Sequence, residues 1–257
     1  MSGAGAARQG CLLQELTAEA LKARAAEAPA VILPLASIEI LGAHGPVGVD
    51  LAVAEAAGRE IAARTGCLLA PAIPYGDTQE FGALPGTVHV PAPALEAYVY
   101  AVAKSLLVRC GARAVLLLCV HSLNGFAASA VCRRLTAEGY RAATADWWAA
   151  VGGAADGLLH DRENGRGHGG EMITSVALHV CGGQVRMDRA ACEQPLPGLQ
   201  AVNRWKGTPF AAFGSFAGYC RGGAWGDTSH ASAEQGALLM ERGVEAVCAF
   251  LNEAFGG

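Results

Sequence analysis

Short apolar runs alternate along this chain with longer segments of helical periodicity, and this alternation constrains the fold more than any other feature. The pattern is typical of repeated βα units, in which helices cover both faces of a mostly parallel sheet. The sequence therefore predicts the α/β class. The expected strands are 31–35, 67–70, 114–120 and 141–144, and the expected helices are roughly 51–64, 92–109, 125–138, 169–180 and 232–254.

The chain shows no linker, internal repeat or low-complexity tract that would divide it into domains. We expect a single domain over residues 11–257, preceded by a flexible N-terminal segment over residues 1–10. Two glycine-rich regions, 149–170 and 206–231, are longer than the loops of most compact domains. Long loops of this kind often carry function, so we expect parts of a site there.

Composition limits the partners of the protein. Apolar residues make up 52% of the 257 residues and charged residues 16%, against about 25% charged residues in an average soluble protein. A net charge of −4 offers no electrostatic footprint for nucleic acid or for an anionic membrane, so neither is expected as a partner. Because subunit interfaces are poor in charge, we expect a homo-oligomer.

The cysteines and the N-terminal sequence indicate the compartment. The 9 cysteines are an odd number and include no CxxC pair, which favours the reducing cytosol. The first ten residues, MSGAGAARQG, lack the apolar centre of a signal peptide. No apolar run approaches the roughly 18 residues of a membrane span. We therefore expect a cytoplasmic protein.

Three polar side chains follow predicted strands where ligands bind in α/β sheets, at the carboxyl ends of the strands. Glu39 follows the first strand, Asp50 closes the same loop at the start of a helix, and His121 follows the central strand. Two carboxylates and an imidazole at one edge make a plausible site for a divalent cation such as Zn, Mn or Fe.

Each of these residues also has an ordinary structural explanation. Asp50 stands where a helix N-cap belongs. Glu39 could pair with an arginine, and His121 could be a hydrogen-bonded, partly buried histidine. Spacing alone does not separate these explanations from metal binding.

The segment GRGHGGEMITS at 165–175 carries a second pair of polar residues, His168 and Glu171. A separation of three residues places both on one face of the predicted helix. One can carry a proton while the other binds a metal ion or orients water. The glycines would allow a substrate to approach the backbone closely.

Two other features near these segments have competing explanations. Cys119 and His121 are separated by one residue, so on a strand their side chains would lean the same way, although a buried structural cysteine is more common than a nucleophile. Trp147 and Trp148 lie directly before the first long loop, where they could form an aromatic wall for a small ligand. Packing in the core or at a subunit interface explains them equally well.

Four ordered segments together resemble the motifs of the creatininase (creatinine amidohydrolase) family, and the similarity extends from about residue 30 to residue 250. They are ASIEILGAHGPVGVD at 36–50, the motif at 75–87, CVHSLN at 119–124 and GHGGEMITS at 167–175. The resemblance implies a single-domain α/β fold, a hexamer, and a two-metal centre that hydrolyses cyclic or linear amides. It also implies that Glu39, Asp50, His121 and Glu171 bind the metal and that Tyr75, Thr87 and Asn124 contact the substrate. Trp147 and Trp148 are added to the expected substrate contacts because of their place beside the first long loop.

The departures from the family pattern are as informative as the matches. Leu41 and Phe81 stand where the family has histidines, and neither side chain can bind metal. Leu123 occupies the position of a second-site glutamate in creatininase itself. We therefore expect one metal ion per subunit, with His44 as a possible replacement for a lost imidazole and Cys119 as a possible thiol ligand.

The expected function is a metal-dependent amidohydrolase, or an enzyme forming such a bond by cyclisation, acting on a small polar amide or lactam-like substrate other than creatinine. This is hydrolysis of C–N bonds other than peptide bonds. Glu171 would hold or deprotonate the water, and His168 would protonate the leaving nitrogen. The alternatives are a peptidase that trims a precursor peptide, a non-catalytic subunit or binding protein with the same fold, and a metal-independent enzyme built around Cys119.

Overall fold

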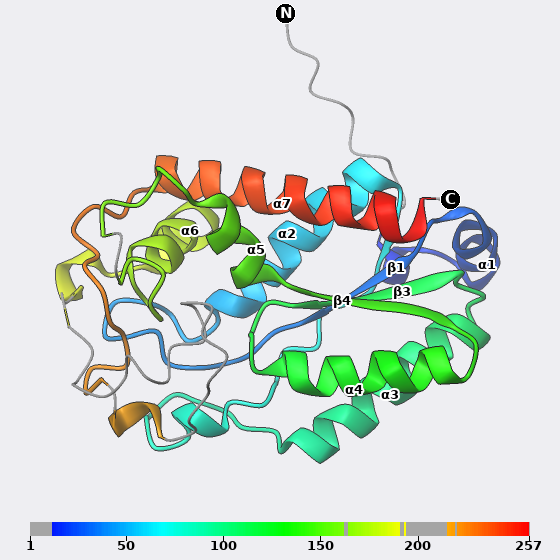
Figure 1. The fold of residues 1–257 in the computed structure, drawn as a ribbon, viewed down its shortest axis with the longest axis horizontal. Coiled ribbons are helices and arrows are strands. Elements are labelled where there is room, and N and C mark those ends of the chain that lie inside the picture. Colours follow the sequence, from blue (N-terminus) through cyan, green and yellow to red (C-terminus); the bar gives the residue numbers. More distant parts are fainter. Residues whose placement is uncertain (1–11, 162–163, 191–192, 194–214, 219, 257) are drawn as a thin grey trace, which may run out of the picture.

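The structure is a computed structural model that describes residues 12–161, 164–190, 193, 215–218 and 220–256 (Figure 1). The expected flexible segment 1–10 and residues 206–214 of the second long loop lie outside the described residues.

A four-stranded parallel sheet forms the centre of the molecule and confirms the predicted fold class. The strand order is β2-β1-β3-β4, and the register pairs Leu35 at the end of β1 with Cys119 at the end of β3. The strands therefore end at one edge, which brings the loops that follow them together. The bounds are β1 Val31–Leu35, β2 Leu68–Leu69, β3 Ala114–Cys119 and β4 Arg141–Asp146.

Helices cover both faces of the sheet (Figure 1). Side chains of β3 alternate between the two faces, with Leu116 in one core cluster and Leu117 in the other, as the twofold repeat of a strand requires. The first face packs against α2 Val49–Thr65, α5 Trp147–Ala154, α6 Glu171–Cys181 and α7 Ala233–Phe255, and the second against α1 Ala18–Glu27, α3 Ala92–Val108 and α4 Asn124–Ala137.

Two helices of the structure, α1 and α5, are absent from the sequence prediction. α1 was not expected because its alanine-rich sequence has little apolar periodicity, although the Thr17 hydroxyl caps it by accepting from Ala20 N. α5 lies largely within the predicted loop 149–170. Its two adjacent glycines disfavour helix, but burial of Trp147 and a cap from Asp146 override that propensity.

A third and smaller apolar cluster lies apart from the two sheet faces and consists of Phe81, Leu123, Phe216, Cys220 and Trp225. Short 3₁₀ helices contribute two of these residues, Phe81 from η2 Gln79–Phe81 and Phe216 from η7 Phe216–Gly218. The other short helices in the described ranges are η1 Leu13–Glu15, η3 Gly182–Gln184 and η4 Met187–Arg189. None of the described helices combines the length and apolar character needed to cross a bilayer.

Candidate metal centre

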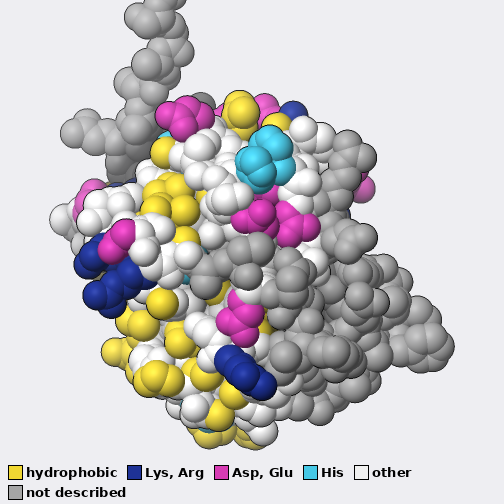
Figure 2. All heavy atoms as spheres, turned by 90° about the vertical axis from the view of Figure 1, so that its left-hand side faces the viewer, with side chains coloured by type: hydrophobic (Ala, Val, Ile, Leu, Met, Phe, Trp, Pro, Cys, Tyr) yellow, Lys and Arg dark blue, Asp and Glu magenta, His cyan; other side chains and the backbone are white. Residues whose placement is uncertain are grey.

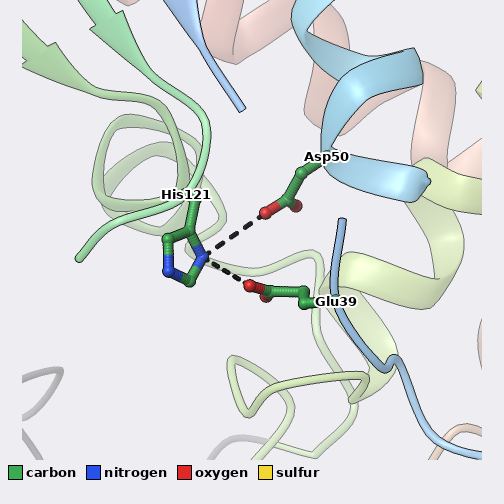
Figure 3. A group of neighbouring side chains, drawn as sticks. All are labelled: Glu39, Asp50 and His121. Atoms are coloured by element: carbon green, nitrogen blue, oxygen red, sulfur yellow. Dashed lines mark ion pairs between the residues drawn. The ribbon is translucent and has the colours of Figure 1, made fainter. Parts of the chain in front are cut away.

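Glu39, Asp50 and His121 meet at the carboxyl edge of the sheet (Figure 3). Glu39 comes from the loop after β1, Asp50 from the start of α2, and His121 from the turn after β3. One ligand atom from each lies within 4.8 Å of the other two, and all three residues are buried. Within the described part of the chain, no other group of three or more histidine, cysteine or acidic residues converges in this way.

The imidazole of His121 turns one nitrogen toward both carboxylates (Figure 3). Nδ1 is 2.8 Å from Glu39 Oε2 and 3.6 Å from Asp50 Oδ2. The other nitrogen, Nε2, is 2.9 Å from the carbonyl oxygen of Asp77, which can only accept a hydrogen bond. Nε2 therefore carries a hydrogen, and in the neutral ring the lone pair is on Nδ1, facing the carboxylates.

Asp50 lies in the first turn of α2, and Gly48 rather than Asp50 occupies the N-cap position. The capping explanation of Asp50 is therefore wrong. Its carboxylate accepts two side-chain hydrogen bonds instead, from Ser37 Oγ to Oδ2 at 2.9 Å and from Trp148 Nε1 to Oδ1 at 3.3 Å.

Burial and mutual charge shift the pKa values of the group. Burial raises the pKa of Asp50, and the negative charge of Glu39 raises it further. Burial opposes ionisation of Glu39 and of His121 as well, but their opposite charges outweigh it. The pKa of Glu39 is consequently lowered, and that of His121 is raised well above its usual value. The shifts of His121 and Asp50 both favour the protonated forms of these side chains.

The residues present fit a divalent cation. Glu39 Oε2 is buried and, among the described residues, has no hydrogen-bond partner of acceptable geometry, although it lies close to His121 Nδ1. Two carboxylates and one imidazole are a donor set that zinc and manganese both accept. The Asp77 carbonyl supplies the hydrogen bond that metal-binding histidines commonly make through their second nitrogen.

His168 lies beside this group without belonging to it. Its Nδ1 is 3.8 Å from Glu39 Oε1, and its Nε2 donates to the carbonyl of Ile40 at 2.7 Å. The imidazole packs against Phe81 and Phe216, with ring centroids 4.6 and 5.0 Å away. The neutral ring thus carries its lone pair on Nδ1, on the side of Glu39.

The structure does not bring Glu171 to the metal group. Its buried carboxylate accepts hydrogen bonds from the backbone N–H groups of His160 and Asp161 and from Gln235 Nε2, and it also contacts His160 Nδ1. Burial opposes its ionisation, but these donors lower the pKa of Glu171 overall. Its role in the structure is to join α6 to the 158–161 segment and to α7.

The histidine held by Glu171 lies at the surface. His160 is exposed, and its ring stacks on that of His230 at 4.3 Å. Figure 2 shows histidine side chains beside acidic ones on the left-hand side of the molecule as drawn in Figure 1.

His44 and Cys119 also lie outside the group. His44 Nε2 donates to the hydroxyl of Thr174, which in turn donates to the Gly169 carbonyl, so this buried imidazole supports the turn that carries His168. The Cys119 thiol belongs to the core cluster on the face of α3 and α4 and contacts Thr144 Oγ1 at 3.5 Å. Burial raises its pKa to about 12.

Among the residues expected to bind substrate, Tyr75 is exposed, whereas Asn124 is fully buried. The Asn124 amide donates to the Ala36 carbonyl and accepts from Asp77 N, so it joins the loops that follow β1 and β2. Thr87 Oγ1 accepts from Ile40 N. Asn124 and Thr87 thus brace the backbone beside Glu39 and His121.

The two tryptophans differ from each other. Trp147 is fully buried in the core, and its Nε1 has no hydrogen-bond partner among the described residues. Trp148 is 4% exposed and binds Asp50. Core packing accounts for Trp147, and neither ring forms an open aromatic wall in this structure.

Sequence reasoning missed several contacts of the site. The Asp77 carbonyl and the Ser37 hydroxyl each bind a member of the metal group, and Phe216 packs on His168. Ser37 lies within the segment 36–50 that resembles a family motif, and this is the one available signal. Backbone carbonyls and loop aromatics give no spacing pattern that could have revealed the others.

Fold and site together define an α/β protein with a candidate divalent-metal centre at the carboxyl edge of a parallel sheet. The family model described as creatinine amidohydrolase matches residues 14–251. The chain therefore belongs to the creatininase family.

Relatives and solved structures agree with this membership. A mycofactocin precursor peptide peptidase of Mycobacterium ulcerans is 30% identical over 226 residues, which cover 84% of this chain and 82% of the relative. A creatininase variant described as Zn-Zn type has a TM-score of 0.81 at 25% identity, covering 97% of this chain and 100% of the other. A structure titled "Creatininase Mn" matches with the same TM-score, identity and coverage.

Proposed function

We propose that this protein is a metal-dependent peptidase that hydrolyses a C–N bond of a precursor peptide. Metal dependence is supported by the convergence of Glu39, Asp50 and His121, whose ligand atoms lie within 4.8 Å of one another. The peptide substrate is supported by the 30% identical relative, which is named as a precursor peptide peptidase. The apolar side chain of Leu123, at a position where creatininase has a glutamate, supports a substrate other than creatinine.

Glu39, Asp50 and His121 would hold the cation through two carboxylates and Nδ1 of the imidazole. Such an ion, when bound, supplies Lewis acidity to an amide carbonyl and to the attacking water. We expect Zn, Mn or Fe, and one ion per chain, because Leu41 and Phe81 remove two histidines that the family pattern contains.

His168 is the residue that we assign to proton transfer. Its Nδ1 faces Glu39 with a lone pair, because Nε2–H is held by the Ile40 carbonyl. Nδ1 accepts a proton from the attacking water as the hydroxide oxygen bonds to the amide carbon. The same proton then moves to the leaving nitrogen as the C–N bond breaks. Glu171 was expected to act on the water, but its four contacts with N–H groups favour a structural role.

A second candidate is hydrolysis, or the reverse cyclisation, of a small polar amide or lactam. The observation in its favour is the similarity to creatininase structures over 97% of this chain. Both candidates use the same metal group and the same proton carrier, so they differ in substrate and not in chemistry.

The test is a substrate comparison on purified, metal-loaded protein. A mycofactocin precursor peptide, creatinine, and a panel of small amides and lactams are incubated separately, and the products are identified by mass spectrometry. We expect two fragments from the peptide and no change in creatinine. The Asp50→Asn variant, purified in parallel, controls for contaminating peptidases and should release no fragments.

Each other result selects a different function. Turnover of small amides alone would overturn the peptide proposal in favour of the second candidate. Metal binding without turnover of any substrate would favour the non-catalytic binding protein. Turnover that persists after complete metal removal would exclude the metal mechanism and favour a metal-independent enzyme.

A further inference from the structure

We infer that Trp148 and Ser37 are positioning residues of the metal centre, which together fix the orientation of the Asp50 carboxylate. The inference rests on the proposed metal-dependent function, because it concerns how tightly the cation is held. It gives Trp148 a role other than the substrate contact expected from the sequence.

The two donors bind different oxygens of Asp50. The indole Nε1–H of Trp148 donates to Oδ1 at 3.3 Å, and the hydroxyl of Ser37 donates to Oδ2 at 2.9 Å. Two bonds on two oxygens restrain rotation of the carboxylate about its bond to Cβ. Oδ2 is also the oxygen that lies 3.6 Å from Nδ1 of His121. The restraint therefore acts on the oxygen that faces the rest of the group.

The donors are themselves held in place. Ser37 is fully buried, and Trp148 lies in the core cluster formed by α2, α5 and the sheet. Trp148 is the second residue of α5, whose N-cap Asp146 accepts from Ala149 N at 3.0 Å. The indole is thus fixed by packing and by a capped helix before any ion binds. Without Asp50, its N–H would be buried and unsatisfied, which is energetically costly.

Hydrogen bonds of this kind measurably affect metal affinity. Removal of a residue that orients a metal ligand typically lowers the metal affinity by a factor of about 10–100. Preorganisation explains the effect, because a ligand that is already oriented loses less freedom when the ion binds.

The neighbouring Trp147 offers a matched control. It belongs to the same helix and the same core cluster, but its indole N–H has no hydrogen-bond partner among the described residues. Trp147→Phe and Trp148→Phe therefore remove the same atoms from adjacent positions. Only the second removes a hydrogen bond to Asp50.

The experiment measures zinc affinity of metal-free protein by competition with a chelating dye and follows intrinsic fluorescence during the titration. We expect Trp148→Phe and Ser37→Ala each to bind Zn²⁺ about 10–100-fold more weakly than the wild type. Trp147→Phe should bind with unchanged affinity. The zinc-dependent change in emission should persist in Trp147→Phe and be lost or strongly reduced in Trp148→Phe, because Trp148 alone among the described tryptophans contacts a residue of the metal group.

A purely structural role for Trp148 predicts different results. It would lower the melting temperature of Trp148→Phe while leaving zinc affinity and the fluorescence change as in the wild type, and this outcome would overturn the inference. If Trp148→Phe does not fold, Ser37→Ala and the fluorescence response of Trp147→Phe still test it. Unchanged affinity in Ser37→Ala, or no zinc-dependent emission change in Trp147→Phe, would then overturn it.

Failure of the inference is distinguishable from failure of the proposed function. If the wild-type protein binds no zinc or manganese, the proposed metal-dependent function fails. If the wild type binds an ion and Trp148→Phe binds it equally well, only the positioning role fails. If the role is correct, activity lost in Trp148→Phe should return when the metal is saturating.

Discussion

The imidazole of His168 and the carboxylate of Glu39 face each other, with Nδ1 3.8 Å from Oε1, while the next residue, Ile40, accepts a hydrogen bond from His168 Nε2. One short stretch of loop therefore positions both a candidate metal ligand, Glu39, and the proposed proton carrier, His168. Glu39 is proposed to bind the metal and His168 to transfer the proton. Single substitutions should therefore separate metal binding from turnover.

His168→Ala should keep its metal ion and lose turnover by a factor on the order of 10²–10⁴, as expected for the loss of a general acid–base. Metal content is measured by elemental analysis and turnover by product formation. His179→Ala, which removes an exposed imidazole from the last turn of α6, is the control and should retain full activity. Loss of metal from His168→Ala would show that the imidazole is a ligand instead.

Asp50→Asn should abolish metal retention and activity while leaving the metal-free protein as stable as the wild type. The asparagine removes a charge that burial and Glu39 already disfavour, and it keeps an oxygen for one of the two donors. Glu55→Gln, an exposed change on the same helix, is the control and should alter neither property. Retention of a full equivalent of metal by Asp50→Asn would remove Asp50 from the ligand set.

Elemental analysis of the wild-type protein should return about one divalent ion per chain. The residues at two family histidine positions, Leu41 and Phe81, are buried and apolar, and their side chains offer no metal ligand. His121→Ala should reduce the content further, because it removes the only nitrogen ligand of the described group. A content of two ions per chain would contradict this prediction.

Metal-free protein should lose stability as pH rises from neutral into the alkaline range. Folding raises the pKa of His121 above its usual 6.5, because the carboxylates outweigh burial, and burial with Glu39 raises that of Asp50 above 3.8. A group with a raised pKa stabilises fully below its unfolded pKa, and the contribution is lost as pH rises through its folded pKa. Glu39, whose pKa is lowered, acts in the opposite direction, and only in acid.

Thermal melts of metal-free and metal-loaded protein across this range provide the test. The loaded protein should not show the alkaline loss, because a bound cation replaces the proton, and binding at neutral pH should release protons. Calorimetry in buffers with different ionisation enthalpies measures that release. Identical pH dependence of the two forms would contradict the assignment of His121 and Asp50 to the metal group.

Cys119→Ala should leave metal affinity and turnover unchanged. The thiol lies in the core cluster on the face of α3 and α4, and burial raises its pKa to about 12, so it carries no thiolate at neutral pH. The same assays of metal content and product formation apply. A large loss of metal affinity or of turnover in a folded variant would instead support Cys119 as a metal ligand or as a nucleophile, the two roles that the sequence left open.

The sheet could be predicted from the sequence because β1, β2 and β3 are short apolar runs that are fully buried, while β4 at the edge of the sheet is only partly buried. The period of the apolar residues also marked five helices, with limits within a few residues of those observed for α2, α3, α4, α6 and α7. It missed α1 and α5, where alanine content and a pair of glycines conceal the periodic signal. α5 is stabilised by tertiary packing and not by helix propensity, because the helix buries Trp147 in the core.

For the site, the sequence predicted that Glu39, Asp50 and His121 would meet, but it left their structural explanations open and added Glu171, which the structure does not bring to them. Glu39 and His121 lie in the loops that follow β1 and β3, Asp50 lies in the first turn of α2, and parallel strands bring such positions to one edge. The tertiary structure sets the contacts of the residues around this group. It turned Glu171 toward the backbone of His160 and the Cys119 thiol toward Thr144, and it brought the Trp148 indole to Asp50. These outcomes depend on side-chain direction and on hydrogen-bond partners far away in the chain, and neither is encoded in the local spacing of residues.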